Sequence, residues 1–130
     1  MKFLCLICAE KVMEQMPEAD AQRHYDEYRD FTDDVRKNGH LLGCNRLQPP
    51  QTAVTVRVRN GKVSTTDGPF AETKEQFGGY YLIEARDRDE AVLVAARIPG
   101  ARLGCVEVRP VAEDARTLEV LGAGPGAASR

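Results

Sequence analysis

The sequence contains no apolar stretch longer than the one from Phe3 to Ala9. A helix that crosses a bilayer needs about 20 apolar residues, so no membrane span is expected. Only one Lys precedes this stretch and no small-residue cleavage site follows it, so we expect no signal peptide. Runs of Lys and Arg are also absent, and the net charge is -2. We therefore expect no binding to nucleic acid or to an anionic membrane.

Phosphate-binding and metal-binding motifs are missing as well. There is no G-x-G-x-x-G sequence and no P-loop, so no nucleotide cofactor is predicted. The pair Cys5-x-x-Cys8 has no second C-x-x-C and no nearby His pair, so we predict no metal. On a strand, these two thiols would point to opposite faces and could share neither a metal nor a disulfide. All four cysteines, including Cys44 and Cys105, lie in apolar runs, and we expect them to be core residues of a cytoplasmic protein.

The composition that remains is that of an ordinary globular protein. The 130 residues are 42% hydrophobic and 29% charged, which is typical of one soluble domain. We expect this domain over residues 1–112 and a C-terminal extension over 113–130. We expect the domain to bind no cofactor. From Thr117 onwards the extension is rich in Gly and Ala and is expected to be an exposed tail.

Two helices and a central strand follow from the hydrophobic periodicity. Lys2 to Cys8 is apolar on both faces, which is typical of a central strand. A helix is predicted from Pro17 to about Asn38, with Gly39 as its stop. Its buried stripe would contain Ala21, Tyr25, Tyr28, Phe31 or Thr32, and Val35. A second helix, from Asp87 to Ile98, begins with a capping box formed by Asp87 and Glu90.

The remaining predicted strands surround a hairpin. Ala53 to Arg59 alternates between Val and polar residues, and Asn60-Gly61 then predicts a tight turn into a return strand, Lys62 to Thr66. Further strands are predicted over 40–47, 79–85 and 103–111. Residues 71–77 would form a polar connection with helical character.

The order of these elements predicts an α+β fold. It is β-α-β-(β-hairpin)-β-α-β, the ferredoxin-like βαββαβ arrangement with an inserted hairpin. Two helices can cover only one face of such a sheet. Because the first strand and the segment from Tyr80 to Ile83 are apolar on both faces, a second copy of the chain is the simplest cover for the other face. We expect a homodimer with two sheets stacked face to face.

A family resemblance is carried by residues 67–75 and 78–81. The sequence Asp67-Gly68-Pro69-Phe70-Ala71-Glu72-Thr73-Lys74-Glu75, followed by Gly78-Gly79-Tyr80-Tyr81, resembles the signature of the DGPF-domain family of YCII-related proteins. Segments 47–50, 56–63, 95–99 and 106–111 extend the resemblance, in order, over about residues 1–111. The resemblance implies a dimeric α+β barrel built from two ferredoxin-like subunits.

The resemblance also implies two kinds of function. The wider superfamily includes small-molecule enzymes of the lactone isomerase and dehydrochlorinase types, with a cleft between helix and sheet. Other relatives are associated with extracytoplasmic-function sigma factors. Better-studied YCII relatives use a His on the first helix together with an Asp. Counted back from Gly39, that position falls near Tyr28 and not at His24, so the His–Asp pair is not carried over intact.

Asp67 is the main catalytic candidate. It ends the return strand and begins a Gly-Pro turn, where a carboxylate could accept a substrate proton or orient a ligand. An Asp in this position could equally hydrogen-bond the backbone of the turn. Arg57 and Arg59 share one strand face and could clamp a substrate carboxylate, or could form a solvated face.

Other candidates lie on the first helix and in the polar connection. Tyr28 is on the predicted buried stripe, and its hydroxyl would need a partner there, so it is a catalytic candidate beside Asp67. His24, at the edge of the stripe, could bind substrate or serve packing. Lys74 and Glu75 (with Glu72) could place charges at the mouth of a cleft, or could form a solvated face.

Two functions therefore stay open. The first is binding of a small anionic or aromatic molecule, with cofactor-free proton transfer by Asp67 and Tyr28 or an Arg. The second is a non-enzymatic regulatory module that acts with a sigma factor, which the acidic face of the first helix favours. A third interpretation makes the segment Asp67-Gly68-Pro69-Phe70 a folding element only.

Overall fold

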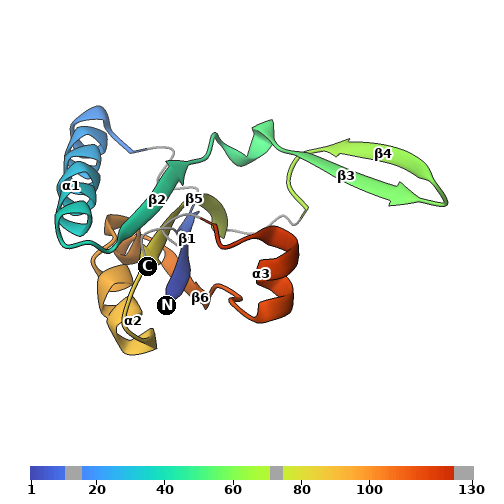
Figure 1. Cartoon of the computed structure of the whole chain (residues 1–130). Helices are drawn as coiled ribbons and strands as arrows, with labels where there is room; N and C mark the ends of the chain where they lie inside the picture. Colours follow the sequence, from blue (N-terminus) through green and yellow to red (C-terminus); the bar gives the residue numbers. More distant parts are fainter. Residues whose placement is uncertain (11–15, 71–74, 125–130) are drawn as a thin grey trace.

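The computed structural model describes residues 1–10, 16–70 and 75–124 and shows a four-stranded sheet from which a long hairpin extends (Figure 1). The sheet contains β1 (Lys2–Glu10), β2 (Leu41–Arg46), β5 (Glu75–Glu84) and β6 (Cys105–Pro110), in the order β2-β5-β1-β6. The hairpin, which we call the arm, consists of β3 (Val54–Arg59) and β4 (Lys62–Asp67). Each of these strand pairs is antiparallel.

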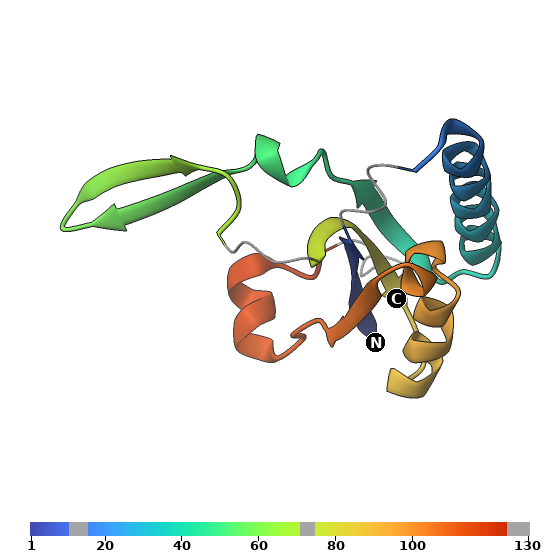
Figure 2. The same cartoon turned by 180° about the vertical axis from the view of Figure 1, so that it is seen from behind.

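The helices lie on both sides of the sheet. α1 (Glu18–Lys37) and α2 (Arg88–Ala96) lie on one side, and α3 (Ala115–Leu121) lies on the other (Figure 2). Two 3-10 turns, η2 (Pro50–Thr52) and η3 (Pro99–Arg102), connect β2 to the arm and α2 toward β6. The predicted α+β class is thus confirmed.

The hydrophobic core lies between the sheet and the two helices α1 and α2. β1 contributes Phe3, Cys5 and Ile7, which are buried on the same face of the strand. The helices contribute side chains at helical spacing, above all Phe31, Val35, Ala91 and Val94. The opposite face of β1, called here the open face, has half-buried residues at Leu4, Leu6 and Cys8.

The structure contains the helix cap and the hairpin turn that local sequence signals predict. The Asp87 carboxylate accepts the Glu90 N–H at 2.9 Å, although Glu90 in return accepts from the N–H of Arg86 and not of Asp87. Asn60 and Gly61 both have positive φ angles, 53° and 74°, as a two-residue hairpin turn requires. The predicted hairpin is therefore confirmed.

The predicted stripe of α1 is partly wrong. Tyr25 is 50% exposed, and its hydroxyl is bound by Arg46 at the rim of β2. The face that contacts the sheet and η3 instead carries His24, Tyr28, Phe31 and Val35 at spacings of three and four residues. The sequence pattern could not separate these two stripes because both positions 24 and 25 carry rings that can be buried or exposed.

Two segments differ from the predicted elements. β5 begins at Glu75, so residues 75–77 are strand and not a helical connection, and residues 71–74 lie outside the described residues. The predicted tail contains α3, whose start is capped by Asp114: its carboxylate accepts from the Thr117 N–H at 3.1 Å. The helix ends at Gly122, which has a φ of 78°. The tail was predicted from the Gly/Ala-rich composition after Thr117, and that composition gives no indication of the Asp114 cap that precedes it.

The far side of the sheet is only partly covered. The ammonium group of Lys2 donates to the carbonyl of Ala123, so the chain after α3 buries the Lys2 end of the open face. At the other end of β1, Cys105 is exposed, contrary to the prediction that all four cysteines are in the core. The arm also exposes Val54, Val56 and Val58, each more than half, because no other described part of the chain buries them.

Candidate functional site

Tyr28 lies where α1 meets η3, and we call this place the α1–η3 junction. Its hydroxyl oxygen accepts the backbone N–H of Gly100 at 3.0 Å, although 72 residues separate the two. The contact is close: a methyl group on Gly100 would lie 2.6 Å from the Tyr28 oxygen and 2.8 Å from Cγ2 of Ile7. Since the oxygen already accepts one hydrogen bond, the phenolic hydrogen can be donated to a further acceptor.

His24 lies one helical turn before Tyr28. The two rings meet edge to face, with centroids 4.9 Å apart. The Nε2 atom of His24 is enclosed and makes no hydrogen bond to the described part of the chain. A polar atom without a partner in a folded protein is uncommon and calls for an explanation, such as a bound molecule.

Burial at the junction favours the neutral forms of both side chains. Burial lowers the pKa of His24, and Arg102 lowers it further, whereas Glu27 raises it. Burial also raises the pKa of Tyr28 to about 12, although the Gly100 N–H acts in the opposite direction. At neutral pH the site therefore presents a neutral imidazole beside a protonated phenol.

The surroundings of the junction hold these rings in place. Arg102 of η3 pairs with Glu27 of α1, so an ion pair joins the same two elements as the Tyr28–Gly100 hydrogen bond. On the sheet side, the hydroxyls of Tyr81 and Thr32 are 2.6 Å apart, and the Tyr81 ring meets Phe31 edge to face. Such partly buried contacts limit the rotamers of neighbouring side chains.

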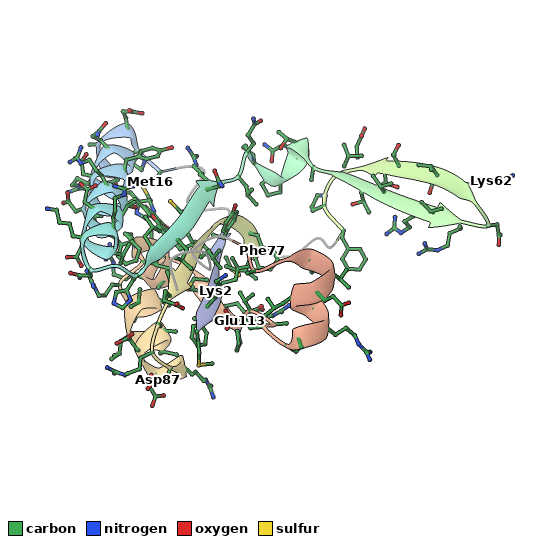
Figure 3. The ribbon with its side chains drawn as sticks, viewed as in Figure 1. Lys2, Met16, Lys62, Phe77, Asp87 and Glu113 are labelled. Carbon is green, nitrogen blue, oxygen red and sulfur yellow. The ribbon has the colours of Figure 1, made fainter. Side chains whose placement is uncertain are left out.

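Asp67 does not lie at the junction within one chain. It ends β4 at the base of the arm, where it pairs with Val54, and Figure 1 shows the arm extending away from α1. Figure 3 shows Lys62 at the far tip of the arm and Met16 beside the start of α1, at opposite ends of the molecule. The Asp67 side chain is exposed and makes no hydrogen bond or ion pair to other described residues. The turn is held instead by neighbours, since the Gly68 N–H donates to Ala53 and the Thr55 hydroxyl donates to the Gly68 carbonyl.

The other candidates are also dispersed. Arg57 pairs with Ser64 and Asp67 with Val54, so Arg57 and Asp67 lie on opposite faces of the arm. Arg59 shares the Arg57 face near the tip. Lys74 and Glu72 lie outside the described residues, and Glu75 is described only as the first residue of β5.

Two residues of the junction could not be found from the sequence. Gly100 follows Pro99 directly after the predicted second helix, and neither Gly100 nor Arg102 belongs to a motif that predicts a site. The signal for both is long-range, since Tyr28 and Glu27 on α1 bring η3 to the helix.

Among the described residues, no cluster of three or more His, Cys, Asp or Glu side chains could hold a metal ion. No described helix is long and apolar enough to span a membrane.

Fold and site together define a small α+β domain in which a helix and a 3-10 turn hold an imidazole and a phenol beside an antiparallel sheet. The chain belongs to the family with the YCII-related domain, whose model matches residues 1–114. It is also similar to the uncharacterized protein R00369 of Rhizobium meliloti (strain 1021), with 46% identity over 76 residues. That match covers 57% of this chain and 61% of the relative, so the chain spans about three fifths of the relative's length.

Proposed function

We propose that this protein binds a small polar molecule at the α1–η3 junction and moves a proton on it without a cofactor. The enclosed and unpartnered Nε2 atom of His24, beside the Tyr28 hydroxyl, is the observation that carries this proposal. A neutral imidazole accepts a proton, and a protonated phenol donates a hydrogen bond to the oxygen on which negative charge develops. Carboxylates, phenols and lactones have groups that fit this pair.

Asp67 enters the proposal only through a second copy of the chain. Within one chain it ends β4 of the arm, whereas Tyr28 is on α1, and the arm extends away from α1 (Figure 1). The arm carries Asp67 on the same face as Val54, Val56, Val58 and Val63, so a second copy that covers the valines also contacts the Asp67 side. The strand order β2-β5-β1-β6 further supports a ferredoxin-like subunit of a dimeric α+β barrel.

The protonation of His24 gives the first test. Because its pKa in the folded chain lies below the ordinary value of 6.5, the unfolded state binds more protons as the pH falls through this range. Stability is therefore full above about pH 6.5 and decreases below it. We expect His24→Gln to remove part of this decrease, measured as melting temperature against pH from 8 to about 5.

The same pKa can be measured directly. The chain has two His residues, so the ring-proton NMR signal that is absent from His24→Gln belongs to His24. We expect this signal to titrate below pH 6.5 in the wild type. A midpoint above 6.5 would mean that an acidic neighbour dominates over burial, and the neutral base would then be excluded.

Ligand binding gives the second test, as a thermal-shift screen of small carboxylates, phenols and lactones. A ligand at 100 times its dissociation constant adds about 2.7 kcal/mol to the free energy of unfolding. For this length that corresponds to a rise in melting temperature of about 5 to 15 °C. We expect a shift that is lost in His24→Gln and kept in Lys62→Gln, which changes an exposed side chain at the tip of the arm.

Asp67→Asn belongs in the same screen because it separates two versions of the site. A shift lost in Asp67→Asn would place Asp67 at the ligand through the second copy, and a shift kept there would leave the junction of one chain as the whole site. If no compound shifts the wild type, the small-molecule proposal fails, and the sigma-factor alternative would be tested by co-purification.

A further inference from the structure

Cys8 and Cys105 face each other across two neighbouring strands. They are Cα partners in the antiparallel register of β1 and β6. Both side chains lie on the open face, because Cys5 and Ile7 of β1 point into the core and residues alternate along a strand. Both are thiols in the structure, Cys8 half-buried and Cys105 exposed.

The register brings the two thiols within reach of a disulfide. The Val111 N–H donates to the Lys2 carbonyl at 2.9 Å, so every second pair from there, including Cys8 and Cys105, is a hydrogen-bonded pair. Cα atoms in such pairs are about 5.5 Å apart, within the range of about 4.4 to 6.8 Å that disulfides span. Their Cβ atoms are farther apart than a relaxed disulfide prefers, so closure strains the strands slightly.

The position at the strand ends allows this adjustment. Cys105 is the first residue of β6, and the pairing of β1 with β5 shifts register between Ile7 and Cys8. Lys2 and the chain around Ala123 lie at the opposite end of β1, and the Cys105 side chain is exposed. A strained and exposed disulfide is reduced more easily than a structural one, which makes the bond reversible.

We propose that Cys8 and Cys105 form an intramolecular disulfide by exchange with a low-molecular-weight disulfide. The exposed Cys105 thiolate attacks one sulfur of the small disulfide, breaks its S–S bond and releases one small thiolate. The Cys8 thiolate then attacks the Cys105 sulfur and releases the second small thiolate. Overall, the two protein thiols are oxidised, the small disulfide is reduced to two thiols, and the two protein protons end on them.

The other two cysteines cannot take these roles. Cys5 is fully buried, and burial raises the pKa of its thiol to about 11, so it is inert. Cys44 pairs with Tyr81 on β5 and packs against the core, on the face opposite to the cysteine pair. Cys44 is half-buried like Cys8, which makes Cys44→Ser a matched control.

The test exposes the full chain to oxidised glutathione and follows the products by mass spectrometry and peptide mapping. We expect the wild type and Cys44→Ser to yield a Cys8–Cys105 cross-linked peptide with no retained glutathione. Cys8→Ser should keep one glutathione on Cys105, because the second step is missing. Cys105→Ser should slow the modification of Cys8 by about tenfold or more, because the half-buried thiol is reached less easily.

Three results would overturn the proposal. These are a wild type that retains glutathione on Cys105, a disulfide that joins two chains on a non-reducing gel, and a cross-link that involves Cys44. The proposal is independent of the α1–η3 junction, so a failed ligand screen leaves it standing.

Discussion

Replacing Gly100 with Ala is expected to lower the free energy of unfolding by about 1 to 3 kcal/mol. The new methyl group would lie 2.6 Å from the Tyr28 oxygen and 2.8 Å from Cγ2 of Ile7, closer than such atoms approach. Neither neighbour can move away easily, because Ile7 is a buried core residue and Tyr28 lies between α1 and η3. Urea unfolding followed by circular dichroism measures the change.

A double-mutant cycle separates the clash from other effects of this substitution. Tyr28→Phe alone removes the oxygen that accepts the Gly100 N–H and leaves that donor unpaired. Combined with Gly100→Ala, it also removes the closest contact, so we expect the double variant to be more stable than the sum of the two losses predicts. Gly43→Ala is the control, because a methyl group there meets nothing within 4 Å. An additive cycle would mean that Gly100 and Tyr28 are not in contact.

Replacing Val56 with Glu is expected to convert the proposed dimer to a monomer. Val56 is 59% exposed in one chain, so a carboxylate there is solvated and the subunit should stay folded. In the proposed dimer the second copy covers the arm's valines, and burying an unpaired carboxylate is costly. We expect the dissociation constant to rise by about 100-fold or more. Light scattering at micromolar concentration measures this as a mass that falls from two chains to one.

Arg57→Glu is the matched control for this variant. It puts the same carboxylate one residue further along β3, on the opposite face of the arm, so the proposed dimer should still form. If the wild type itself elutes as a monomer, the dimer proposal is refuted. A Val56→Glu variant that still elutes as a dimer would place the interface elsewhere on the chain.

Much of the fold could be predicted from the sequence because its signals are local. Asn60-Gly61 requires positive φ angles and so marks the hairpin, and Asp87 with Glu90 marks the start of α2. The apolar faces of β1 were likewise assigned correctly, with Cys5 in the core and Cys8 on the other side. In each case the deciding contact lies within a few residues or follows from strand alternation.

The site was less predictable because its contacts are long-range. Tyr28 was identified as a buried tyrosine that needs a partner, but nothing near it in sequence pointed to Gly100. Proton transfer by Asp67 with Tyr28 or an Arg was predicted, yet the strand register puts Asp67 and Arg57 on opposite faces of the arm. The hairpin itself was predicted, but no pattern of residues shows that it leaves the sheet.

The arm has a consequence for how the molecule folds. It is a two-stranded ribbon whose valines find little to bury against within one chain, and an isolated hairpin of this kind is only marginally stable in water. In the proposed dimer its order therefore depends on the partner, so formation of the arm and association of the subunits become one cooperative event. Dilution would dissociate the proposed dimer, and the arm with the Asp67 turn would then lose its fixed geometry while the core stays folded. Any role of Asp67 would therefore depend on protein concentration.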